Sequence, residues 1–411
     1  MVESPLVSGI PTPYDMVIEL DWNGAFPLRG SEITIKFSKI IGLGVFDDFS
    51  SNGTADLVAL KEWLGRQHDL VLGYFNYDLK NCLENIDSSD SDRIGFPLFH
   101  FFVPIDVYIL TDEGWIRYSK GTIGAESGRS QLQAYIGSES AQIRKEMYCH
   151  QVENLQQHIQ FGDIYEVNYC VQHGFENTVV EPYRLYQELK ENSPAPFSCF
   201  LVDDGKYLMS ASPERFMRKE GNRIMSQPMK GTNRRTSDNE KQKDALRNNA
   251  KEVAENVMIT DLVRNDLSRS AKRGSVKVDE LCGVYEFEHV NTMISTVSAE
   301  LREDVHPLDA LLNAFPMGSM TGAPKIRAME LIDQFEDFSR GLYSGAVGYF
   351  TPDLDFDFNV VIRSILYNEE KKVVTFPTGG AITINSDPEK EYEECMLKAE
   401  AMRYVLLYHA K

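Results

Sequence analysis

Hydrophobic positions follow different spacings in the two parts of the chain. Up to about residue 135 they form short runs, as at 99–103 and 107–110, which are typical of strands joined by irregular loops. Farther along, Tyr148, Val152 and Leu155 recur at helical spacing, and that pattern ends at Gly162. We therefore predict a strand-rich region over residues 1–135 and a second region over 136–411.

The second region mixes predicted helices with strands that are separated in sequence. Strands are predicted over 164–171, 297–301, 343–350, 358–366 and 372–376. Helices are predicted over 307–315, 323–335 and 388–409, and over 238–268 as one long helix or two in sequence. The polar stretch 86–93 is predicted to be a loop. This mixture favours an α+β fold.

Composition and charge restrict the function. The 411 residues suggest two or three domains or one large one, and 42% hydrophobic with 25% charged residues is typical of a soluble globular protein. The net charge of −20 argues against nucleic-acid binding, which needs a basic surface. An anionic substrate would need local cations or a metal ion to reverse that field.

The cysteines and the N-terminus indicate a compartment. None of the six cysteines falls in a close pair such as CxxC, so we expect free thiols in a reducing environment. Residues 1–24 lack a signal-peptide pattern, and no apolar run approaches the roughly 18 residues that a membrane span needs. A cytoplasmic protein without membrane segments is expected.

One lysine is placed unusually, in the segment 227–232 with sequence QPMKGT. Pro228 fixes its own φ and Gly231 permits a backbone shape that other residues resist, so a rigid turn could aim Lys230 into a cleft. Lysine becomes a strong nucleophile when burial or nearby charge lowers its pKa. An exposed turn lysine is the alternative, since lysine is rarely buried.

Two predicted helices carry paired acids, Glu252 with Glu255 and Glu391 with Glu394. A spacing of three places both carboxylates of each pair on one helix face. Four carboxylates from two helices could hold Mg²⁺, with water completing the coordination. Two solvated acidic faces are the alternative interpretation, because glutamate is mostly exposed.

Two further elements could contact an anion. The glycine-rich segment 377–382, PTGGAI, is interpreted as a turn whose backbone N–H groups could face an anion. Arg363 is a cation within an apolar predicted strand. It either forms a salt bridge at an edge or faces a cleft, where it would suit bidentate recognition of a carboxylate.

Seven segments together resemble the chorismate-utilising enzymes, in the order of that family, and the resemblance covers most of residues 70–410. They are 162–168 (GDIYEVN), 212–216 (SPERF), 228–232 (PMKGT), 261–267 (DLVRNDL), 318–325 (GSMTGAPK), 344–349 (SGAVGY) and 387–389 (DPE). Residues 73–79 (GYFNYDL) resemble a further N-terminal element of the family. The resemblance implies large antiparallel sheets packed in a sandwich with helices outside, and makes 136–411 the chorismate-binding catalytic region.

Position 230 separates branches of this family. Lysine there is characteristic of members that form 4-amino-4-deoxychorismate for 4-aminobenzoate and folate synthesis, and anthranilate-forming members carry alanine. The resemblance implies that Lys230 attacks C2 of chorismate while the C4 hydroxyl leaves with help from Glu214 as acid/base. Ammonia then adds at C4 and displaces the lysine. Anthranilate formation for tryptophan synthesis stays as the alternative, and an inactive regulatory relative is a third reading.

Three positions distinguish or depart from the family's patterns. Glu166 stands where water-adding members carry lysine and amino-transferring members commonly carry glutamine, so water addition at C2 is disfavoured. A hydrogen-bonding strand residue is its alternative role. Thr292 aligns with a histidine of the anthranilate-forming members, which argues against aromatisation. Ala381 replaces the last glycine of the glycine-rich segment.

The resemblance also implies binding roles and a partner. Glu255 and Glu394 would contact Mg²⁺ directly, and Glu252 and Glu391 through water. The implied substrate-binding residues are Arg363, Tyr343, Ser319, Gly231, Thr232, Gly379, Gly380, Ala381 and Lys398. No cysteine lies in a recognisable glutaminase nucleophile elbow, and the chain has no room for an amidotransferase domain, so a separate glutaminase subunit is expected to supply ammonia.

Overall fold

The computed structural model describes residues 14–27, 34–51, 56–86, 92–120, 134–140 and 143–409. Most of the predicted loop at 86–93 and the first part of the N-terminal segment lie outside these residues. The elements of the first region are β1 (Met16–Asp21), β2 (Gly24–Pro27), β3 (Thr34–Phe37), β4 (Lys39–Ser50), α1 (Leu57–Arg66), β5 (Val71–Phe75), η1 (Tyr77–Leu79), α2 (Lys80–Glu84), β6 (Phe99–Thr111) and β7 (Gly114–Ser119).

The second region continues with more helices and short strands. Its first half contains β8 (Ser138–Glu139), α3 (Lys145–Phe161), β9 (Glu166–Val171), β10 (Gly174–Glu176), α4 (Pro182–Asn192), β11 (Phe197–Asp203), β12 (Lys206–Ser212), β13 (Arg215–Glu220), β14 (Arg223–Gln227), β15 (Met229–Arg234), α5 (Asn239–Arg247) and α6 (Ala250–Ser268). Its second half contains β16 (Lys277–Glu286), β17 (Val290–Glu300), α7 (Pro307–Ala314), η2 (Gly318–Met320), β18 (Gly322–Ala323), α8 (Lys325–Phe335), β19 (Ala346–Phe350), β20 (Phe356–Asn359), β21 (Ser364–Asn368), β22 (Val373–Thr375), β23 (Thr378–Ile382) and α9 (Pro388–His409).

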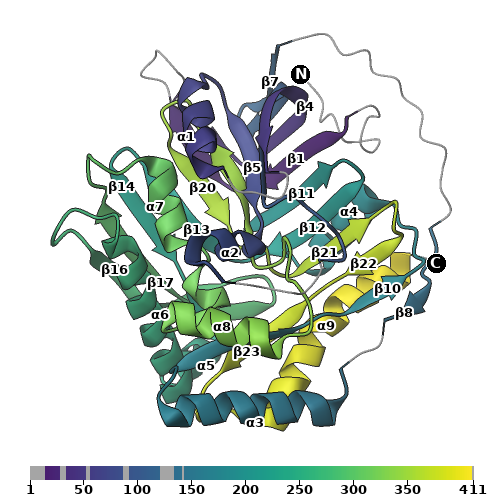
Figure 1. Cartoon of the computed structure of the whole chain (residues 1–411), viewed down its shortest axis with the longest axis vertical. Helices are drawn as coiled ribbons and strands as arrows, with labels where there is room; N and C mark the ends of the chain where they lie inside the picture. Colours follow the sequence, from purple (N-terminus) through teal and green to yellow (C-terminus); the bar gives the residue numbers. More distant parts are fainter. Residues whose placement is uncertain are drawn as a thin grey trace.

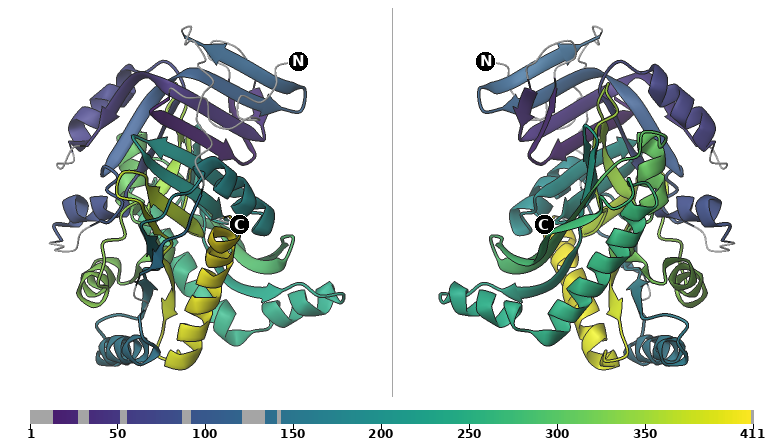
Figure 2. Two further views of the ribbon diagram at one scale, coloured as in Figure 1. Left: turned by 90° about the vertical axis from the view of Figure 1, so that its right-hand side faces the viewer. Right: turned by 90° about the vertical axis from the view of Figure 1, so that its left-hand side faces the viewer.

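Antiparallel pairing joins most of these strands into one 18-stranded sheet, drawn in Figure 1. The two predicted regions share it, because β1 pairs with β11 and β5 pairs with β19. A separate three-stranded sheet has the order β18-β9-β23. Figure 2 shows the N-terminal strands at the end of the molecule opposite α3. The predicted α+β fold with large antiparallel sheets is confirmed. The division near residue 135 stays a prediction.

The three-stranded sheet is held by its own hydrophobic cluster. Tyr148 and Val152 of α3 pack with Val167 of β9, Leu331 of α8 and Cys395 of α9. The apolar stripe predicted on the first of these helices therefore faces the core, and Gly162 ends that helix in the left-handed conformation, with φ 86°. Val167 therefore faces this cluster, and Glu166, the residue before it, lies on the opposite face of β9.

Three expectations about local structure are corrected. The predicted strand 358–366 is two strands, β20 and β21, and Arg363 lies between them with φ 51°. The glycine-rich segment is not a turn, since β23 pairs with β9 along its length. Lys230 lies in strand β15 rather than in a turn. Of the two alternatives for 238–268, two consecutive helices, α5 and α6, are observed.

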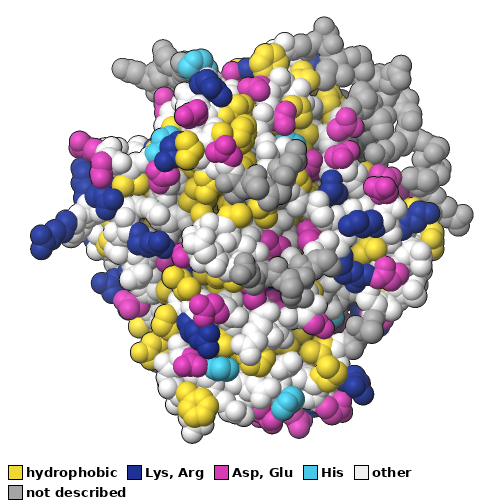
Figure 3. Space-filling view, in the orientation of Figure 1, with side chains coloured by type: hydrophobic (Ala, Val, Ile, Leu, Met, Phe, Trp, Pro, Cys, Tyr) yellow, Lys and Arg dark blue, Asp and Glu magenta, His cyan; other side chains and the backbone are white. Residues whose placement is uncertain are grey.

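The distribution of charged side chains and the state of the cysteines are consistent with the sequence. On the face shown in Figure 3, Lys and Arg side chains are interspersed with Asp and Glu. All six cysteines are free thiols, as predicted. Within the described ranges, no helix combines the length and the apolar character that crossing a bilayer requires.

Candidate active site

Lys230 lies at an irregularity of its strand. The pairing of β15 with β17 shifts register between Met229 and Thr232, and Gly231 between them has φ 87°. Such a conformation favours glycine, and a Cβ at this position would lie 3.1 Å from Glu252 Oε2. The irregularity turns the Lys230 side chain inward, where its Nζ lies 3.1 Å from Glu166 Oε1 and its side chain is 15% exposed.

The largely buried Lys230 is surrounded by acids. Burial alone would lower the pKa of Lys230, but the carboxylates of Glu166, Glu255 and Glu214 together raise that pKa above its ordinary value. This differs from the expectation that a nucleophilic lysine has a lowered pKa. In this state Lys230 is therefore an ammonium ion, and a reaction at Nζ first needs that proton to be removed.

Glu214 has the opposite character. It lies between β12 and β13, is 5% exposed, and Ser319 Oγ donates a hydrogen bond of 2.7 Å to its Oε1. Burial raises the pKa of Glu214 to about 7, against the lowering effects of the Ser319 hydrogen bond and the Lys230 charge. A carboxyl group with such a pKa can donate a proton near neutral pH.

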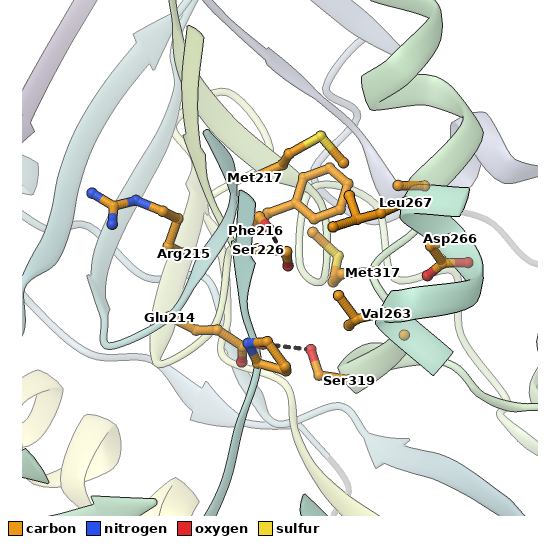
Figure 4. Close-up of a pocket in the computed structure, with 13 residues that line it drawn as sticks. Glu214, Arg215, Phe216, Met217, Ser226, Val263, Asp266, Leu267, Met317 and Ser319 are labelled. Carbon is orange, nitrogen blue, oxygen red and sulfur yellow. Dashed lines mark hydrogen bonds between the residues drawn. The ribbon is translucent and has the colours of Figure 1, made fainter. Parts of the chain in front are cut away.

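A small cavity beside Glu214 explains part of this shift. Figure 4 shows Glu214 and Ser319 at one end of the cavity, joined by their hydrogen bond, with Phe216, Met317 and Leu267 along it. Apolar walls remove water from the carboxylate without replacing its hydrogen bonds. Lys230 and the four paired glutamates do not line this cavity, so it lies behind Glu214 rather than around the lysine.

The two acid pairs meet across helices α6 and α9. The Nζ of Lys251 lies 3.7 Å from Glu255 Oε1 and 3.8 Å from Glu391 Oε1, and so bridges the helices. Partial burial lowers the pKa of Lys251, but all four glutamates, including Glu252 and Glu394, raise it more. The four predicted metal ligands therefore surround one cation of the chain itself.

The donor set suits a hard cation. Carboxylate oxygens are the ligands that Mg²⁺ prefers, and the Lys251 ammonium occupies a cation's place between the helices. Burial raises the pKa of Glu255 to about 7, which indicates that its charge is incompletely compensated. Across the described residues, no three His, Cys, Asp or Glu side chains are close enough to form a ready metal cluster.

Lys398 connects the glycine-rich strand to α9. Its Nζ donates a hydrogen bond of 2.8 Å to the Gly379 carbonyl oxygen and lies 2.9 Å from Glu394 Oε1. A Cβ on Gly379 would lie 2.4 Å from the Tyr169 carbonyl oxygen, so only glycine allows β23 to lie this close to β9. Gly380 and Ala381 follow in the same strand.

Arg363 and Tyr343 lie on the α9 side of the site. The Arg363 side chain reaches solvent, but the protein around its guanidinium removes water and lowers its pKa, while Tyr343 and Glu394 oppose that shift. Tyr343 is buried, with its hydroxyl 3.8 Å from Cys170 Sγ. The exposed Thr232 pairs with Thr292 on β17.

Comparison with known proteins identifies the family. Residues 47–404 match the sequence model of the chorismate binding enzymes. This chain belongs to the chorismate-binding enzyme family. It is therefore a chorismate-utilising enzyme, as the resemblance in the sequence predicted.

Curated members of the family with two different products are about equally similar. Aminodeoxychorismate synthase component 1 of Bacillus subtilis is 32% identical over 363 residues, which are 82% of this chain and 76% of that protein. Anthranilate synthase component 1 of Acetivibrio thermocellus is 31% identical over 376 residues, covering 81% and 74%. The chloroplastic aminodeoxychorismate synthase of Arabidopsis thaliana is 40% identical over 263 residues, which are 62% of this chain but 28% of that longer protein.

Solved structures of the chorismate-binding enzyme family share the fold. Anthranilate synthase component I of Streptococcus pneumoniae superimposes with a TM-score of 0.74 at 22% identity, covering 98% of this chain and 93% of that one. The menaquinone-specific isochorismate synthase of Escherichia coli gives 0.72 at 17% identity, covering 97% and 96%. At these identities the likeness establishes the fold alone.

The sequence analysis missed several contacts around Lys230 and the paired glutamates. Glu166 was given only a possible hydrogen-bonding role, although an acid inside the apolar strand 164–171 is itself a signal of a buried charge. The sequence patterns also assigned no role to Lys251. Asn256, which is 2% exposed, donates hydrogen bonds of 3.2 Å to the carbonyl oxygens of Lys230 and Met293 and so ties α6 to the lysine strand.

Proposed function

We propose that this chain is an aminodeoxychorismate synthase component I, which converts chorismate and ammonia to 4-amino-4-deoxychorismate for 4-aminobenzoate and folate synthesis. The observation that carries the proposal is the largely buried Lys230, whose Nζ contacts Glu166 and lies within the electrostatic range of Glu214. A nucleophile and a near-neutral acid in one site are what replacement of a ring hydroxyl requires.

The proposed reaction uses Lys230 and Glu214 in two stages. The Lys230 amine bonds to C2 while the two ring double bonds shift and the C4–O bond breaks, and Glu214 donates the proton with which the hydroxyl leaves as water. Ammonia then bonds to C4, the double bonds shift back, and the bond from C2 to the lysine nitrogen breaks. The extra proton on the new C4 nitrogen returns to Glu214, so both groups recover their starting states.

Substrate binding is assigned to the surrounding residues. Mg²⁺, when bound, would supply the positive charge that holds the ring carboxylate, and Glu252, Glu255, Glu391 and Glu394 would hold the ion. The cations Arg363 and Lys398 offset the acids of the site on the α9 side. The other proposed substrate contacts are Tyr343, Ser319, Gly231, Thr232 and the backbone of Gly379, Gly380 and Ala381.

The ammonia source is proposed to be a separate glutaminase subunit. The name component 1 of the Bacillus subtilis relative implies a second component for that protein, and the same arrangement is proposed for this chain. Ammonium salts should replace this partner in an assay, because the residues proposed to act on chorismate all lie in this chain.

Anthranilate synthase component I is the second candidate function. The identity of 31% to the Acetivibrio thermocellus enzyme favours it. Against it, position 230 is lysine rather than alanine, and Thr292 stands where anthranilate-forming members carry histidine.

Product analysis distinguishes the two candidates. The protein is incubated with chorismate, Mg²⁺ and an ammonium salt, and the products are separated, with and without the lyase that makes 4-aminobenzoate. We expect 4-aminobenzoate only when the lyase is present, and a large loss of product in Lys230→Ala with Mg²⁺ binding retained. Fluorescent anthranilate without any 4-aminobenzoate would refute the proposal.

A further inference from the structure

One carboxylate oxygen of the buried Glu166 contacts Lys230, and the other has no hydrogen-bond partner in the part of the chain that the structure describes. It begins strand β9, which is paired on both sides, with β18 and with β23, and the residue is 1% exposed. Its Oε1 lies 3.1 Å from Lys230 Nζ. Its Oε2 is buried without a hydrogen-bond partner among the described residues. A carboxylate buried in this way is costly unless both oxygens are satisfied.

The lysine beside Glu166 must lose a proton before it can act as a nucleophile. Its side chain is 15% exposed, so bulk water has little access to the ammonium group. The acids that act on it are Glu166 on β9, Glu255 on α6 and Glu214 between β12 and β13, with weaker effects that link it to Glu252 and Glu394. The proton therefore needs an acceptor inside the site.

Among these acids, Glu166 alone contacts Lys230 Nζ at hydrogen-bonding distance. Glu214 already accepts a hydrogen bond from Ser319, and its proposed role is to donate a proton to the leaving hydroxyl. Glu255 faces Lys251 at 3.7 Å and belongs to the proposed metal site. The geometry leaves Glu166 as the group that can take a proton directly from Nζ.

We propose that Glu166 is a catalytic residue that accepts the Nζ proton of Lys230 as the amine attacks chorismate, and returns it when the amine leaves. This inference rests on the proposed lysine attack. One N–H bond of Lys230 breaks and one O–H bond forms on Glu166, which leaves a neutral amine beside a neutral acid. The nitrogen becomes positive again when its lone pair bonds to C2. The reverse transfer restores the ion pair when the bond from C2 to the lysine nitrogen breaks, and no further reactant is needed.

The proposed role also gives a reason for a glutamate rather than a glutamine at position 166. Glutamine is common there in amino-transferring members that the sequence resembles, and an amide has the same size but cannot take a proton at neutral pH. A carboxylate in its place adds a base beside the nucleophile. The chain should therefore turn over at a pH where the lysine alone would stay protonated.

The test compares Glu166→Gln with Glu166→Asp in the full chain. Turnover is measured with saturating chorismate and Mg²⁺ over a range of pH, with the concentration of NH₃ rather than of total ammonium held constant. For Glu166→Gln we expect a loss of about 10²-fold near neutral pH. The ratio of its rate to the wild-type rate, in which the titration of Glu214 cancels, should then rise about tenfold per pH unit as solvent removes the lysine proton. Glu166→Asp keeps the acceptor, so its rate should be reduced by a factor that does not change with pH.

Two results would overturn the role of Glu166. One is a Glu166→Gln variant with unchanged turnover near neutral pH, which would mean that no acceptor is needed at this position. The other is a loss of equal size at every pH in Glu166→Gln, which would mean that the side chain only positions Lys230. A wild-type protein that forms no aminodeoxychorismate, or a fully active Lys230→Ala variant, would instead refute the proposed function.

Discussion

The hydrogen bond from Ser319 to Glu214 gives a quantitative prediction about the acid of the site. Replacing Ser319 by alanine removes the 2.7 Å bond that stabilises the ionised carboxylate and leaves the burial of Glu214 in place. Burial already raises the pKa of Glu214 to about 7, and the bond opposes that rise. The pKa of Glu214 should therefore move farther upward in Ser319→Ala.

The size of this change follows from the strength of such bonds. A hydrogen bond to a charged group contributes about 1.5–3 kcal/mol, and one pKa unit corresponds to about 1.4 kcal/mol. The pKa of Glu214 should therefore rise by roughly one to two units. Because Glu214 is proposed to act as the protonated acid, activity falls as pH rises through this pKa. The alkaline limb of the pH profile should move from about 7 to roughly 8–9.

The assay is the pH dependence of kcat/KM for chorismate, measured at a constant concentration of NH₃. Ser226→Ala is the matched control, because Ser226 lines the same cavity but donates its hydrogen bond, of 2.6 Å, to the Phe216 carbonyl oxygen. The control should leave the alkaline limb in place. An unmoved or lowered limb in Ser319→Ala would refute the assignment of Glu214 as the acid whose pKa this bond controls.

Two further predictions concern stability and metal binding. Folding raises the pKa of Glu214 from 4.5 to about 7, so its stabilising contribution is complete below about pH 4.5 and is lost as pH rises through 7. Glu214→Gln should therefore have a higher free energy of unfolding than wild type at about pH 8.5, by up to roughly 3 kcal/mol, but not near pH 5. Urea unfolding midpoints that are equal for the variant and wild type at both pH values would contradict this prediction. Lys251→Met should bind Mg²⁺ about three- to tenfold more tightly by calorimetric titration, because two weak, partly exposed ion pairs no longer compete for Glu255 and Glu391. The exposed Lys241 on α5 provides a charge-matched control, and an equal effect in Lys241→Met would show that only net charge matters.

The elements that the sequence predicted best are those with a local signal. Helix α9 was predicted over 388–409 and has those bounds, because the acidic first turn after Asp387 and a continuous run of helix-forming residues define it. Helix α3 ends at Gly162, whose backbone adopts the left-handed helical conformation. In both cases short-range chemistry decides the structure.

The break at Arg363 had no such signal. The segment around it is apolar and reads as one continuous strand, but its backbone bonds to other loops: Val360 N–H donates to Glu214, and Val361 N–H donates to Gly345. These partners are distant in sequence. The positive φ of Arg363 is therefore a tertiary effect that no local pattern contains.

The sequence predicted which residues form the candidate site, but not how their charges act on one another. The candidate lysine, acid and metal ligands were named from motifs, and Lys230 lies within electrostatic range of Glu214 and Glu255 in the structure. What could not be predicted is the sign of the pKa shift of Lys230. That sign depends on how many carboxylates come near the ammonium, and Glu166 is 64 positions away in the sequence.

The pairing of β5 with β19 has a consequence for any attempt to isolate the catalytic region. A fragment that begins at residue 136 would lose β1 and β5, and with them the partners of β11 and β19. Strand β19 is buried throughout, so its unpaired backbone and apolar side chains would become an open edge. Open hydrophobic edges recruit strands from other molecules. Such a fragment should self-associate rather than stay monomeric, whatever its active-site residues can do.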